Sequence, residues 1–116
     1  MSKSVIVIDD DYDTVQLFSE ILEENGIKVV GSGYNGKSAL DLYKKHSPDA
    51  VLVDIMMPNG SGFYAIKKIQ EYDPNAKLIA VTADMSSVTE EKLTKLEIPI
   101  IYKPFKMDVV LSTIKN

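Results

Sequence analysis

Five short apolar runs, each followed by a stretch with apolar residues at helical spacing, constrain the fold of this chain more than any other feature. Three of the runs, "VIVI", "AVLV" and "LIAV", are continuous and do not alternate with polar residues. Continuous runs of this length are typical of strands that are covered on both faces in a parallel sheet. The five predicted strands are Val5–Ile8, Ile27–Val30, Ala50–Val53, Leu78–Val81 and Pro99–Tyr102.

The stretches between these runs have the pattern of amphipathic helices. In the first, Val15, Phe18 and Leu22 share one helical face, and Gly26 follows as a stop signal. The other predicted helices lie around Ala39–Tyr43, Ala65–Ile69, a capping box at Ser87–Glu90, and Met107–Lys115. Strand and helix thus alternate five times, which predicts an α/β sandwich built on a parallel sheet.

Length and composition restrict the classes of function. We expect the 116 residues to form one domain, 1–116, with no effector domain in this chain. All 13 basic residues are Lys and the net charge is −4, whereas nucleic-acid binding favours a basic stripe rich in Arg. The chain has no Cys and no apolar run near the ~20 residues of a membrane span. We therefore predict a cytoplasmic protein that contacts neither nucleic acid nor membrane directly.

Reactive side chains follow four of the five predicted strands. In open parallel sheets, ligands bind beyond the carboxyl ends of the strands, so residues at those ends are expected to meet at one edge. Any one such residue also has an ordinary structural explanation. An acidic residue after a strand often caps the next helix, and Asp11 or Asp13 is expected to do so for the first helix. The residues at the strand ends are Asp9 and Asp10, then Asp54, then Thr82, and finally Lys103.

This set of side chains has a coherent chemistry. Two carboxylates about 4 Å apart repel by roughly 4 kcal/mol at an effective dielectric of 20, so the acidic cluster calls for a cation. Carboxylate oxygens suit Mg²⁺, with Mn²⁺ as the alternative ion, and Mg²⁺ together with Lys103 would balance three carboxylates. A carboxylate can also act as a nucleophile toward phosphorus, with Lys103 and the Thr82 hydroxyl stabilising the phosphoryl oxygens.

Four motifs, in this order, make the chain resemble the receiver domain of two-component response regulators, the CheY-like superfamily. The resemblance spans essentially the whole chain and implies a flavodoxin-like, doubly wound (βα)5 sandwich with strand order 2-1-3-4-5. The motifs are "VIVIDDD", "DAVLVDIMMPNGSG" (Asp49–Gly62), "LIAVTA" (Leu78–Ala83) and "YKPF" (Tyr102–Phe105).

The resemblance implies a role for each residue of the site. Asp54 matches the phosphoacceptor, and the Lys103–Pro104 peptide is expected to be cis. The other implied roles are direct Mg²⁺ ligation by Asp10 and by the backbone carbonyl of Met56, contact through a metal-bound water by Asp9, the switch hydroxyl at Thr82, and its ionic partner at Lys103.

The resemblance also implies partners. The phosphoryl donor would be a sensor histidine kinase or a histidine phosphotransfer protein, which docks on the first helix. Phosphorylation would switch the face made by the fourth helix, fifth strand and fifth helix, where a downstream protein target binds. The domain would be a signalling protein that assists its own Mg²⁺-dependent phosphotransfer and autodephosphorylation, as a monomer or a weak, phosphorylation-dependent dimer.

The chain departs from the family pattern in the predicted fifth strand. The position three residues before Lys103, where receivers usually carry an aromatic switch residue, is Ile100, and Tyr102 is the nearest aromatic. Both residues share one face of the predicted strand, so Tyr102 is the candidate substitute. We also expect Met56 and Asp84, which flank the phosphoryl site in the family pattern, to set the lifetime of the phosphorylated state.

Other functions are compatible with parts of the sequence. "DYDTV", Asp11–Val15, matches the signature of haloacid-dehalogenase-like phosphatases, although Asp54 then stays unexplained. A receiver-like module that binds a partner without being phosphorylated is the other alternative. A flavodoxin-like FMN carrier is excluded, because three carboxylates after the first strand would repel its phosphate.

Overall fold

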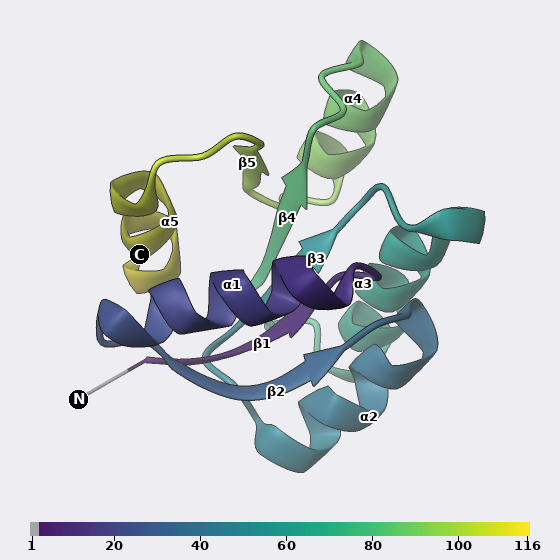
Figure 1. The fold of residues 1–116 in the computed structure, drawn as a ribbon. Coiled ribbons are helices and arrows are strands. Elements are labelled where there is room, and N and C mark those ends of the chain that lie inside the picture. Colours follow the sequence, from purple (N-terminus) through teal and green to yellow (C-terminus); the bar gives the residue numbers. More distant parts are fainter. Residues whose placement is uncertain (1–2) are drawn as a thin grey trace.

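The computed structural model describes residues 3–116 and has a five-stranded parallel sheet at its centre (Figure 1). The strand order is β2-β1-β3-β4-β5, which confirms the flavodoxin-like arrangement expected from the sequence. The strands are β1 (Ser4–Ile8), β2 (Lys28–Gly33), β3 (Ala50–Asp54), β4 (Leu78–Thr82) and β5 (Ile100–Tyr102).

Helices cover both faces of the sheet and divide the core into two clusters (Figure 1). On one face, α1 and α5 pack through Val15, Phe18 and Val110. On the other face, α2, α3 and α4 pack through side chains that include Ala39 and Leu93. The helices are α1 (Tyr12–Glu24), α2 (Gly36–His46), α3 (Ser61–Tyr72), α4 (Ser87–Lys95) and α5 (Met107–Lys115), with a short 3-10 turn at Pro58–Gly60.

The second strand differs most from its predicted bounds. It begins one residue later than Ile27 and continues through the small residues to Gly33. The strand extends because its backbone pairs with β1 as far as Ile8, and this ladder needs no apolar side chains. Helix α2 also lies very close, since a Cβ at Gly33 would come within 2.7 Å of the Ser38 hydroxyl oxygen.

Two helix starts refine the sequence prediction. Helix α4 is capped by Ser86, one residue before the predicted capping box, because Ser86 is extended and its Oγ accepts from Thr89 N–H at 3.4 Å. At α1, Asp11 occupies the N-cap position, but its carboxylate accepts the Thr14 hydroxyl at 2.6 Å and no backbone N–H.

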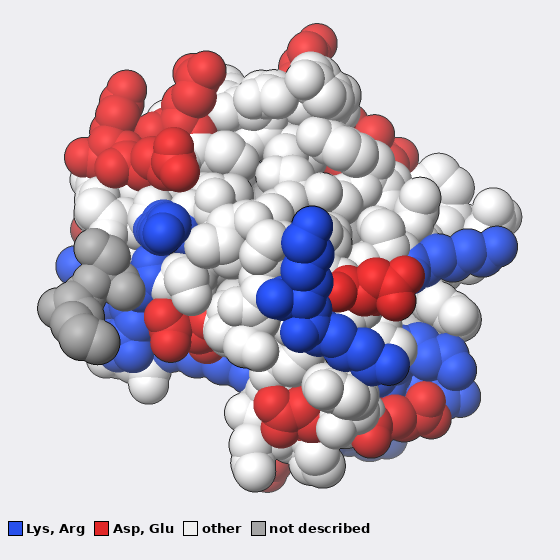
Figure 2. Space-filling view, turned by 90° about the horizontal axis from the view of Figure 1, so that it is seen from below, with Lys and Arg blue, Asp and Glu red and all other residues white. Residues whose placement is uncertain are grey.

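The charged surface is mixed. On the face drawn in Figure 2, one acidic group lies apart, other acidic side chains adjoin basic ones, and the lysines form no single continuous stripe. Within residues 3–116, the helices lack the combination of length and apolar character that crossing a membrane requires.

Candidate functional site

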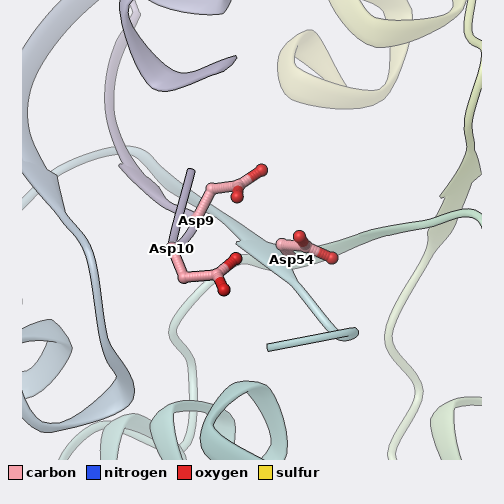
Figure 3. Close-up of side chains that lie close together, drawn as sticks. All are labelled: Asp9, Asp10 and Asp54. Atoms are coloured by element: carbon pink, nitrogen blue, oxygen red, sulfur yellow. The ribbon is translucent and has the colours of Figure 1, made fainter. Parts of the chain in front are cut away.

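Three carboxylates meet at the carboxyl edge of the sheet. Asp9 and Asp10 directly follow β1, Asp54 is the last residue of β3, and the two strands are paired up to Ile8 and Val53. One carboxylate oxygen from each acid lies within 4.8 Å of the others. Figure 3 shows the three side chains extending from these neighbouring strand ends. The predicted acidic cluster is therefore formed.

Lys103 brings the positive charge to this cluster. Its Nζ lies 3.3 Å from Asp9 Oδ2 and 3.6 Å from Asp54 Oδ2, so one ammonium bridges two carboxylates. The Lys103 backbone N–H donates to the Thr82 carbonyl at 2.9 Å, which extends the pairing of β4 and β5 to this residue. The Lys103–Pro104 peptide is cis, as the resemblance implied.

The electrostatic environment of Asp54 disfavours its negative charge. Burial raises the pKa of the Asp54 carboxyl, and the neighbouring Asp9 raises it further. The Met56 N–H, which donates to Asp54 Oδ1 at 2.9 Å, and the Lys103 ammonium both oppose this shift. The net effect of these opposing influences is a raised pKa of Asp54. An additional cation beside Asp54 would therefore stabilise its carboxylate.

The donor set suits a hard divalent cation. Three carboxylates supply the oxygen ligands that Mg²⁺ prefers, and Asp10 is exposed, so water can complete the coordination. Met56 N–H is directed at Asp54, whereas ligation by the Met56 carbonyl stays a prediction. The Met56 side chain is 60% exposed, so it is free to line the approach to the site without packing in the core.

Thr82 lies at the same edge, and its hydroxyl has a partner that the sequence did not reveal. Thr82 is fully buried, and its Oγ1 accepts from Asp84 N–H at 2.9 Å. The Asp84 carboxylate turns toward α4, where it accepts from Ser86 N–H at 2.9 Å and from the Thr89 hydroxyl at 2.6 Å. The Thr89 hydroxyl, followed by the Ser86 N–H, lowers the pKa of the Asp84 carboxyl. Asp84 therefore links the site to α4.

The two candidate switch residues lie in β5. Tyr102 pairs with Thr82 across the strand ladder, and Ile100 pairs with Ala80. Ile100 packs against the core on the face of α3 and α4, and Tyr102 is half-buried. The aromatic residue beside Thr82 in the sheet is therefore Tyr102, whereas position 100 carries an aliphatic residue.

The first turn of α3 packs directly on the strand end that carries Asp54. A Cβ at Gly62 would lie 2.5 Å from the Asp54 carbonyl oxygen and 2.9 Å from Ile55 Cα, both of which are backbone atoms. Position 62 in the Asp49–Gly62 motif therefore has to be glycine, because α3 lies too close to the backbone of Asp54 and Ile55 for a larger residue. The adjacent residue, Ser61, accepts the Gly36 N–H at the start of α2 and joins the two helix ends.

Comparison with known proteins identifies the family. The family model described as the response regulator receiver domain matches residues 5–115. This chain therefore belongs to the response regulator receiver domain family, a family of signalling proteins of two-component systems. The match gives no support to the phosphatase alternative, whose first motif would lie at Asp11–Val15.

Similar proteins include response regulators from several bacteria. The chain is 35% identical to the chemotaxis protein CheY of Bacillus subtilis, covering 100% of this chain and 98% of CheY. It is 33% identical to the polar-differentiation response regulator DivK of Brucella anthropi, covering 100% and 96%. Among solved structures, the CheX–CheY–BeF3–Mg²⁺ complex of Borrelia burgdorferi matches with a TM-score of 0.87 at 27% identity, covering 97% and 86%. The chain is thus homologous to the CheY and DivK response regulators.

Proposed function

We propose that Asp54 is the phosphoacceptor of this receiver and that Thr82 and Lys103 act with it. The observation that carries the proposal is the position of Asp54, which is buried at the end of β3 with the Lys103 ammonium 3.6 Å from its Oδ2. In the transfer, an Asp54 carboxylate oxygen forms a bond to phosphorus while the bond from phosphorus to the donor breaks. The leaving group, imidazole or acetate, keeps the bonding electron pair.

The acidic cluster would hold Mg²⁺, or Mn²⁺ in its place, through Asp10, Asp54 and the Met56 carbonyl, with Asp9 acting through a bound water. When bound, the ion neutralises negative charge on the phosphoryl oxygens. Lys103 adds a second positive charge at the same edge, already in contact with Asp9 and Asp54. The Thr82 hydroxyl would donate its free proton to a phosphoryl oxygen.

The partners that we propose follow from the family. A phosphorylated histidine, on a sensor kinase or a phosphotransfer protein, would donate the phosphoryl group while docked along α1 in the cytoplasm. The face of α4, β5 and α5 would then bind a downstream protein. The related CheY of Borrelia burgdorferi forms a complex with CheX, BeF3 and Mg²⁺, which supports a protein as the downstream target.

The proposal is tested by intact-mass spectrometry after incubation of the protein with acetyl phosphate. We expect one added phosphoryl group per chain with Mg²⁺ present and none with Mg²⁺ replaced by excess EDTA. Circular dichroism in both buffers serves as the control that the fold is retained. A folded protein that gains no phosphoryl group under either condition would contradict the proposal and favour a receiver-like module that binds without phosphorylation.

The side chain at position 56 is expected to set the rate of autodephosphorylation. Met56 is exposed beside the site, and its thioether is a weak hydrogen-bond acceptor that orients water poorly. Met56→Asn introduces an amide that can hold the attacking water, so the phosphorylated state should decay faster, by roughly several-fold. The decay is followed by intact mass after acetyl phosphate is removed. Met56→Leu, which stays apolar, should keep the wild-type lifetime, and an unchanged rate in Met56→Asn would disprove this role.

A further inference from the structure

The connection between β4 and α4 is held by a chain of hydrogen bonds that begins at Thr82. Asp84 is the centre of this chain, because its N–H donates to Thr82 Oγ1 at 2.9 Å. Its carboxylate accepts from Ser86 N–H at 2.9 Å and from Thr89 Oγ1 at 2.6 Å. One residue thus contacts both the hydroxyl at the site and the first turn of α4.

Helix α4 depends strongly on these polar contacts. Leu93 is its single buried side chain, and Met85 and Val88 at its start are 73% and 68% exposed. Little apolar packing therefore holds the first turn of α4 in place, and the bonds from Asp84 and Ser86 fix its position. A displacement of Asp84 would be passed directly to this turn.

The hydroxyl of Thr82 cannot move toward Asp54 without affecting Asp84. A threonine hydroxyl donates one hydrogen bond and accepts others, and here Oγ1 accepts from Asp84 N–H. If Oγ1 shifts to donate to a phosphoryl oxygen on Asp54, the Asp84 N–H must follow it or lose its partner. In the first case Asp84 is displaced, and its carboxylate bond to Thr89 changes with it. In the second case the connection between β4 and α4 loses one of the bonds that hold it.

We propose that Asp84 is a positioning residue that couples the Thr82 hydroxyl to α4, through its N–H on one side and its carboxylate bond to Thr89 on the other. The coupling stabilises the unphosphorylated arrangement of the β4–α4 connection. The effect of this coupling on phosphorylation rests on the proposed role of Asp54. The hydrogen-bonded link itself exists in the unphosphorylated protein.

The first test uses amide hydrogen exchange without any phosphoryl donor. Thr89→Val removes the hydroxyl and keeps the branched shape, and we expect amides 87–90 to exchange up to about tenfold faster. Thr82→Ala should speed exchange of the Asp84 amide and of the same turn of α4. Thr94→Val, at an exposed position near the other end of α4, is the matched control and should change neither. Unchanged exchange of the first turn in both Thr89→Val and Thr82→Ala would overturn the link.

The second test measures the rate of labelling by acetyl phosphate with Mg²⁺. Because Thr89→Val removes a bond that favours the unphosphorylated arrangement, labelling should become several-fold faster. In a Thr82→Ala background, Thr89→Val should have no further effect on that rate, since its influence passes through the Thr82 hydroxyl. An equal effect of Thr89→Val in both backgrounds would show a simple helix cap and overturn the coupling. Absence of labelling in every variant, wild type included, would instead contradict the role of Asp54, while the exchange test still decides the link.

Discussion

Replacing Asp54 with Asn should abolish labelling by acetyl phosphate and at the same time make the protein more stable. The amide is not a nucleophile for phosphoryl transfer, so no phosphoryl mass should be added. Burial raises the pKa of the Asp54 carboxyl, which means that the folded protein disfavours its anion. An uncharged side chain of the same shape removes this penalty and keeps an oxygen for the Met56 N–H. The free energy of unfolding at neutral pH should rise by on the order of 1 kcal/mol.

The gain in stability has a defined pH dependence. The pKa of Asp54 in the folded protein is raised above its ordinary value of 3.8, so the destabilisation is present above the folded pKa. It is relieved as the pH falls, because the protonated carboxyl is uncharged like the amide. Urea unfolding at several pH values, without divalent ions, should therefore show a difference between variant and wild type that shrinks as the pH falls from the raised folded pKa toward 3.8 and is smallest below it.

Asp49→Asn is the matched control at the other end of β3. The Asp49 carboxylate accepts from Ser4 N–H at 2.7 Å, and this bond lowers the pKa of Asp49. Its anion is thus favoured by folding, so the same substitution should decrease stability and leave labelling intact. Loss of stability in Asp54→Asn, or labelling that persists in it, would contradict our account of the Asp54 environment.

Gly62→Ala is expected to lower both the stability of the protein and its labelling by acetyl phosphate. Its Cβ would lie 2.5 Å from the Asp54 carbonyl oxygen and 2.9 Å from Ile55 Cα. Both are backbone atoms, so no side chain can rotate away and α3 must shift. Overpacking of this kind costs about 1–3 kcal/mol and here also displaces the strand end that carries Asp54. We expect lower stability to urea and much slower labelling.

A control for this substitution lies two residues earlier. Gly60 has a positive φ of 68°, and nothing lies within 4 Å of a Cβ placed there. Asn tolerates this conformation, so Gly60→Asn should leave both stability and labelling close to wild type. Wild-type behaviour of Gly62→Ala would show that α3 can move away from β3 at little cost, contrary to the close packing described above.

The features that could be predicted from sequence are those set by strand ends and apolar runs. The continuous runs predicted a parallel sheet, and residues directly after such strands, Asp9 and Lys103, were therefore expected to meet at one edge. The extension of β2 through Gly33 could not be predicted, because an edge strand pairs through its backbone without an apolar signal. Ser86 and Ser87 are adjacent and chemically identical, so sequence alone did not decide which one caps α4.

The link through Asp84 was missed for a different physical reason. A short acidic side chain after a strand can turn toward the site or toward the next helix, and only the fold determines which hydrogen bonds are within reach. In this chain the carboxylate is satisfied by Ser86 and Thr89. The sequence signal for this link was the spacing of three residues: Ser86 at the helix start, Thr89 three residues after Ser86, and Asp84 two residues before Ser86.

The most direct test of the central claim is to locate the phosphoryl group by chemical trapping. Borohydride reduces an aspartyl phosphate to homoserine and releases phosphate, leaving a stable mark on the residue that was phosphorylated. After labelling with acetyl phosphate and Mg²⁺, reduction and peptide sequencing by mass spectrometry should find homoserine at position 54 and aspartate at positions 9 and 10. Homoserine at either of those two positions, or at none of the three, would contradict the assignment of Asp54 as the phosphoacceptor.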